Sequence, residues 1–189
     1  MPKASAAPAI LKAAQACLID GDGTFEMRDV TDRAGVSEGL VYHYYKSKAG
    51  LLAAIVTDFY ARYGAVANRH VDRDVPWLER EAARLRDMVD FLYEDPLARL
   101  VIGGLSRLPE AARTEAEYRR DIAERSVRNV RSGQDQGFIP DWVDAEMAGP
   151  ATIGAMNQVV MQALSADPPP PRDAVTSELW RIIRAIVAA

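Results

Sequence analysis

Residues 27–48, MRDVTDRAGVSEGLVYHYYKSK, hold two short segments on either side of the tetrapeptide AGVS. Apolar and small side chains recur every three or four positions in the first segment, which predicts a helix over residues 27–34. Gly35 can take the left-handed conformation that ends a helix, and Ser37 can cap a second helix over residues 38–45. The stretch therefore predicts a helix-turn-helix, in which the second helix can enter the major groove of DNA.

The second of these helices is expected to turn one face to DNA and the other to the protein core. On the outer face, Gly39 would let the backbone approach DNA closely, and Leu40 could touch a thymine methyl group. Glu38 could accept a hydrogen bond from cytosine, with a solvated side chain as the alternative. His43 could contact a base edge, with a phosphate contact or a structural role as the alternative. The inner face is expected to hold Val41, Tyr44 and Tyr45.

Phosphate contacts are expected from donors around this face. Tyr42 can donate a hydrogen bond to a phosphate, and Arg28 could reach a base or a backbone oxygen. Lys46 and Lys48 follow the second helix, and Lys48 also begins a new helix, whose free N–H groups attract phosphate. The candidate DNA-contacting residues are Arg28, Ser37, Glu38, Gly39, Leu40, Tyr42, His43, Lys46 and Lys48.

The run AGVSEGLVYHYYKSK, followed by Leu51 and Leu52, resembles the N-terminal signature of the TetR family of bacterial transcriptional repressors. The likeness extends over residues 8–66, and the GVS, G, Y-x-YY and SK elements fall in register. Leu40 stands where the family usually has threonine, and Thr31 stands where it usually has alanine. These departures concern the details of base reading and leave the expected fold unchanged.

The resemblance implies an all-α protein with a three-helix DNA-binding head at residues 1–47. Residues 48–189 would form a larger helical domain for ligand binding and dimerisation. The family resemblance also implies a homodimer that represses transcription from a palindromic operator in double-stranded DNA. A small hydrophobic or amphipathic effector would release that operator. The alternative is a helical adaptor or small-molecule-binding protein that uses the helix-turn-helix for protein contacts.

The rest of the chain also has helical periodicity, which predicts about nine helices and no strand. Asp95 and Pro96 resemble an N-cap followed by a first-turn proline, so a helix is expected to start there. Asp141 is expected to cap a helix in which Pro150 should introduce a kink. The expected helices outside residues 27–45 are 10–19, 48–69, 77–94, 96–108, 109–136, 142–166 and 172–187.

The helical remainder supplies candidates for a ligand pocket and a dimer interface. Core packing is the alternative for each pocket residue. Arginines between residues 113 and 131 alternate with acids, which favours a solvated face, although an acyl-CoA or another anion could use some of them. The pocket candidates are Phe59, Tyr63, Met88, Phe91, Leu92, Ile102, Tyr118, Trp142, Met156 and Met161. The interface candidates are Ala148, Ala155, Val159, Leu179, Ile182, Ile183 and Ile186.

The amino-acid composition argues against several classes of protein. The 189 residues carry 23 basic and 27 acidic side chains, a net charge of −4, which argues against a nonspecific DNA coater. A single cysteine, Cys17, excludes an internal disulfide, and two histidines, His43 and His70, leave little for a metal centre. There is no recognisable catalytic motif, signal peptide or apolar span. We therefore expect a cytoplasmic, non-enzymatic protein without cofactor, metal or membrane partner.

Overall fold

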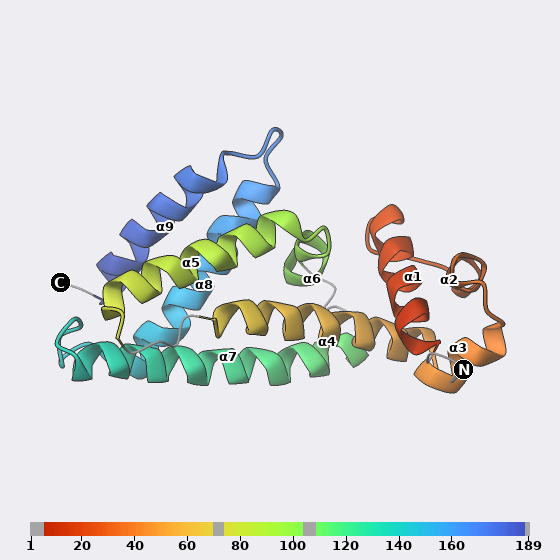
Figure 1. Ribbon diagram of the computed structural model, residues 1–189, viewed down its shortest axis with the longest axis horizontal. Coiled ribbons are helices and arrows are strands. Elements are labelled where there is room, and N and C mark those ends of the chain that lie inside the picture. The colour runs from red at the N-terminus through yellow and green to blue at the C-terminus, as the bar shows by residue number, and fades with distance from the viewer. Residues whose placement is uncertain (1–5, 70–73, 104–108, 188–189) are drawn as a thin grey trace. The chain divides into compact units, whose positions relative to one another are not determined.

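The computed structural model describes residues 6–69, 74–103 and 109–187, and these form nine helices without a strand (Figure 1). The expectation of an all-α fold is confirmed. His70 and the expected helical residues 104–108 lie outside the described ranges. The helices are α1 (Ala7–Asp20), α2 (Met27–Ala34), α3 (Glu38–Tyr45), α4 (Lys48–Ala67), α5 (Trp77–Glu94), α6 (Ala98–Gly103), α7 (Pro109–Asp135), α8 (Ala145–Leu164) and α9 (Arg172–Val187).

The chain divides into two compact units. The first consists of Met1–Tyr60 and Pro96–Ala116, and the second of Ala61–Asp95 and Glu117–Ala189. Helix α4 therefore contributes its first part to one unit and its last part to the other. This division follows packing, and the expected functional boundary after residue 47 stays a prediction.

The first unit is built around α1, which packs against α2 and α3. Ile10 and Leu18 on α1 are fully buried, as is Val30 on α2, which follows from their helical spacing. Gln15 donates a hydrogen bond to Asp58 of α4 at 2.8 Å. Cys17 is buried, as expected, and burial raises the pKa of its thiol.

The second unit packs α9 against α8 and α5. One of its core clusters joins Trp77 of α5 to Val130 of α7, Ala148 of α8 and Val187 of α9. Ile139, in the turn after α7, is buried in the same cluster. Four helices distant in sequence thus share one apolar core.

Two expected helix starts are wrong. Asp95 ends α5 instead of starting a helix, and α6 begins at Ala98, because the Asp95 carboxylate is engaged by Arg62. Helix α8 starts at Ala145 instead of residue 142, and its cap is Asp144, whose side chain accepts a hydrogen bond from the Glu146 amide at 2.9 Å. Burial of Val143 keeps the preceding residues in a turn.

Candidate functional site

The turn between α2 and α3 has the geometry that the sequence predicts. Gly35 ends α2 in the left-handed conformation, with φ of +66°, and the Val36 amide donates to the Thr31 carbonyl at 3.1 Å. Ser37 occupies the N-cap position of α3, but its side chain makes no capping hydrogen bond. Its carbonyl instead accepts from the Leu40 amide at 3.0 Å. The turn is therefore held by backbone hydrogen bonds.

Helix α3 exposes most of the face that was expected to meet DNA. Glu38, Gly39, Tyr42 and His43 are exposed, and Leu40 is half-buried. A Cβ atom placed on Gly39 would meet nothing within 4 Å. The backbone on this face is therefore open to a large partner.

The inner face of α3 is narrower than the sequence suggested. Val41 is fully buried, as expected, and Tyr45 is half-buried, donating its hydroxyl to the Ala7 carbonyl at 2.7 Å. The expectation for Tyr44 is wrong, since it is 38% exposed and stands edge-on to the His43 ring. At about 100° per residue, Tyr45 lies closer to the direction of Val41 than Tyr44 does.

Lys48 contacts two residues that directly precede α2. Its ammonium group lies 3.3 Å from the Glu26 carboxylate and 5.2 Å from the centre of the Phe25 ring. Sequence reasoning did not find this contact, because the partners are 22 residues apart and share no helix. Lys48 thus has its own partners at the N-terminus of α4, and Arg28 stays largely exposed beside Asp32 at 3.8 Å.

Lys46 ends α3 in an unfavourable backbone conformation. Its φ is +66° and ψ is −36°, a region that L-residues rarely adopt. Its ammonium group donates to the His43 carbonyl at 2.8 Å, so the side chain caps the helix whose end it occupies.

We expect Lys46→Gly to raise the free energy of unfolding by about 1 kcal/mol, because glycine relieves the left-handed strain. The same variant should bind DNA more weakly, because a basic group beside the exposed face is lost. Denaturant unfolding and DNA titration measure the two effects. Lys46→Ala is the control: it should weaken DNA binding without the gain in stability. Equal free energies of unfolding for the two variants would contradict backbone strain at Lys46.

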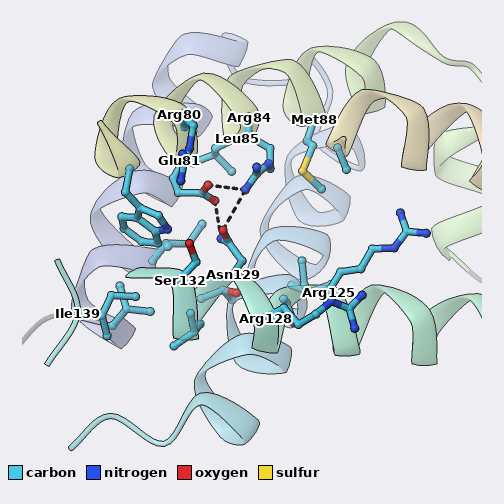
Figure 2. A pocket seen from close by; sticks show the side chains of 18 of the residues that line it. Arg80, Glu81, Arg84, Leu85, Met88, Arg125, Arg128, Asn129, Ser132 and Ile139 are labelled. Carbon is cyan, nitrogen blue, oxygen red and sulfur yellow. Dashed lines mark hydrogen bonds and ion pairs between the residues drawn. The ribbon is translucent and has the colours of Figure 1, made fainter. Parts of the chain in front are cut away.

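The second unit contains a cavity of about 990 Å³ that is open to solvent (Figure 2). Its lining comes from the end of α4 and from α5, α7, α8 and α9. Three of the ten pocket candidates line it, namely Tyr63, Met88 and Met156. The Tyr63 hydroxyl lies 3.8 Å from the Met156 sulfur. These side chains are buried, so they form an apolar wall.

The other seven candidates do not line this cavity. Phe59 and Ile102 belong to the first unit, Leu92 is buried elsewhere in the second, and Trp142 is 71% exposed. Tyr118 places its hydroxyl against α4, where a Cβ atom on Gly64 would lie 2.2 Å away. The remaining two, Phe91 and Met161, are half-buried.

A polar network forms part of the cavity wall. Asn129 of α7 donates a hydrogen bond to the Glu81 carboxylate at 2.6 Å and accepts one from Arg84 at 3.3 Å. Arg84 also pairs with Glu81, its neighbour one turn earlier on α5. Figure 2 shows these three side chains joined between α5 and α7. Arg80 lies beside them with only 7% of its surface exposed.

The dimer-interface candidates are split between the interior and the surface of the second unit. Ala148 and Leu179 are buried within it, and Ile183 lines the cavity. Ile186 packs against the core cluster around Trp77. The other three are half-buried on α8 and α9: Ala155, Val159 and Ile182.

Within residues 6–69, 74–103 and 109–187, no group of three or more His, Cys, Asp or Glu side chains is placed to hold a metal ion. No helix in these ranges combines the length and the low polarity that crossing a bilayer requires. Both findings concern only this described part of the chain.

Comparison with known proteins identifies the helix-turn-helix. Residues 10–55 match the model of the bacterial regulatory proteins of the tetR family. The matched segment contains α1, α2 and α3 together with the first residues of α4. A comparison with curated protein sequences gives no significant match.

Solved structures share the fold along the chain. The fatty acid degradation regulator FadR from Bacillus halodurans is 16% identical, with a TM-score of 0.83 over 97% of this chain and 96% of that one. FadR from Bacillus subtilis, solved with stearoyl-CoA, is 16% identical, with a TM-score of 0.83 over 96% and 99%. SmeT, repressor of a Stenotrophomonas maltophilia efflux pump, is 22% identical, with a TM-score of 0.80 over 98% and 91%. Residues 10–55 thus carry the sequence signature of the tetR family of bacterial regulatory proteins, and the chain shares its fold with these solved regulators.

Proposed function

We propose that this protein is a sequence-specific DNA-binding regulator of transcription that acts as a homodimer and represses a palindromic operator. The observation that carries this proposal is the exposed outer face of α3, where Glu38, Gly39, Tyr42 and His43 stand clear of the core. Lys46 and Lys48 follow this face, where phosphates would run. Residues 1–47 would form the DNA-binding head, and residues 48–189 the ligand-binding and dimerisation domain.

Release from the operator would use the cavity of the second unit. Helix α4 begins at Lys48, a proposed phosphate contact, and its last turns contribute Tyr63, Gly64 and Ala67 to the cavity lining. A ligand that favours one position of these turns would shift the population of head positions competent for DNA. The effector would be a small hydrophobic or amphipathic molecule, since the lining combines buried apolar side chains with arginines and other polar side chains.

Dimerisation would use the outer faces of α8 and α9. Ala155, Val159 and Ile182 keep part of their surface exposed there, which supports this role. Two heads held by such an interface would read two half-sites about one helical turn of DNA apart. The operator would therefore have two-fold symmetry.

The test is selection of random DNA fragments by the purified protein at low and high salt. Enrichment of a palindrome, with affinity that falls steeply as salt rises, is the expected result, because a dimer displaces counterions from several phosphates. Failure of a folded dimer to enrich any sequence would overturn DNA recognition and favour the adaptor function.

The selected operator then tests release. Stearoyl-CoA is a suitable first effector, because a structural relative was solved with it. An effector that weakens operator binding must itself be bound more weakly, by the same factor, when operator is present. Equal effector affinity with and without operator would contradict the proposed switch.

A further inference from the structure

The lining of the cavity in the second unit has a net positive charge, whereas the unit as a whole has more acidic residues than arginines. The unit, formed by Ala61–Asp95 and Glu117–Ala189, contains fourteen arginines and eighteen acidic residues. The cavity lining contains two acidic residues, Glu81 and Asp135, and six arginines. These arginines are Arg80, Arg84, Arg125, Arg128, Arg131 and Arg184. Most of the unit's acidic side chains therefore lie elsewhere.

The acidic side chain that is most enclosed in this lining is already engaged. The Glu81 carboxylate accepts hydrogen bonds from Asn129 and from Arg84, and it is mostly buried. A cationic ligand would have to displace Arg84 from this pair, leaving an arginine of low exposure without its carboxylate. The network therefore disfavours a cation.

An anion would meet guanidinium groups from two helices. Figure 2 shows Arg80 and Arg84 on α5 and Arg125 and Arg128 on α7, the helices that border the cavity. Within the described part of the chain, Arg125 and Arg128 form ion pairs with acids on their own helix, Asp121 at 2.6 Å and Glu124 at 3.9 Å. Such exposed intrahelical pairs contribute little to stability, so a ligand anion can replace them. Guanidinium groups bind carboxylate and phosphate through paired hydrogen bonds.

The rest of the cavity suits an apolar body. Leu85 and Met88 of α5 and Met156 of α8 are buried in its wall. A volume of about 990 Å³ is at the upper end of the range typical of small-molecule sites. We infer that the ligand of this cavity is an amphipathic anion, with an apolar chain against these three residues and a carboxylate or phosphate head on Arg125 and Arg128. The inference rests on the proposed function only in taking the cavity as the effector site.

The chain carries its own reporter for a direct test without DNA. Of its three tryptophans, Trp77 and Trp180 line the cavity, whereas Trp142 is largely exposed and outside the lining. A Trp142→Phe background leaves only the two cavity tryptophans to report binding by fluorescence. The probes are dodecanoate, dodecyl phosphate, neutral methyl dodecanoate and the cation dodecyltrimethylammonium.

We expect one or both anions to bind at least about tenfold more tightly than the ester, and the cation not to bind. Arg125→Gln with Arg128→Gln should lower anion affinity by about tenfold and leave the ester unchanged. Arg120→Gln, on the same helix but outside the lining, is the matched control and should change neither affinity. The anion that binds more tightly identifies the head group.

Four results would overturn the inference: no binding of either anion, an ester that binds as tightly as the anions, a cation that binds most tightly, or a double arginine variant with unchanged anion affinity. A fold check by circular dichroism accompanies each variant, and the ester serves as an internal test of an intact cavity. Anion binding that leaves DNA affinity unchanged would contradict the proposed switch alone. An enriched operator with no anion binding would contradict this inference alone.

Discussion

Lys48→Ala is expected to weaken binding of every DNA sequence by about tenfold at low salt, because the proposed dimer would lose one phosphate contact in each of its two copies. Lys48 stands at the N-terminus of α4, and its ammonium group is held by Glu26 and the Phe25 ring. Its removal also leaves the Glu26 carboxylate without this cation beside the proposed phosphate path. Titration of the selected operator and of unrelated DNA measures the change, and the salt dependence should become shallower.

Lys12→Ala is the matched control for this prediction. Lys12 is an exposed lysine of α1 in the same unit, so its substitution makes the same change in net charge. A similar loss in both variants would mean that Lys48 acts only through overall charge. If Lys48→Ala weakened binding of the operator but not of unrelated DNA, Lys48 would instead contact bases. Either result would contradict the phosphate assignment.

The second large effect is expected from Gly149→Ala, which should lower the free energy of unfolding by about 1–3 kcal/mol. A Cβ atom on Gly149 would lie 2.7 Å from the Val127 amide nitrogen and 2.8 Å from the Ser126 carbonyl carbon. These are backbone atoms of α7, and they cannot rotate away as a side chain can. Helices α7 and α8 would have to separate, and denaturant unfolding measures the cost.

Gly154→Ala on the same helix supplies the control. A Cβ atom there would meet nothing within 4 Å among the described residues. Alanine also favours helix, so this variant should gain about 0.5–1 kcal/mol of stability. The two substitutions are chemically identical and should have opposite signs. A gain in stability for both would show that α7 and α8 are not in the close contact described.

Several sequence expectations depended on local pattern alone, and these agree with the structure. Helices α2 and α3 have the predicted bounds, and Gly35 takes the left-handed conformation. Helix α5 also has its predicted bounds, residues 77–94. Periodicity, a glycine at a helix end and the absence of strand signals act within a few residues, so they can be read without the fold.

Errors arose where a distant contact competed with a local signal. Asp141 and Asp144 are both plausible caps, and burial of Val143 decides for Asp144. Tyr44 and Tyr45 both follow Val41 by about one turn, and the hydrogen bond from Tyr45 to Ala7 takes only one of them inward. The spacing of residues along the sequence predicts neither the N-cap of α8 nor which tyrosine faces the core.

The helix-turn-helix, the all-α class and the family resemblance could all be predicted from the amino-acid sequence, because residues 27–48 carry a contiguous local pattern. The contacts of Lys48 with Glu26 and Phe25, and the close approach of Gly149 to the backbone of α7, became visible with the folded chain. It also gathered Arg80, Arg84, Arg125 and Arg128 around one cavity. These arrangements join side chains and backbone that are far apart along the chain, and packing between helices, not helical periodicity, brings them together.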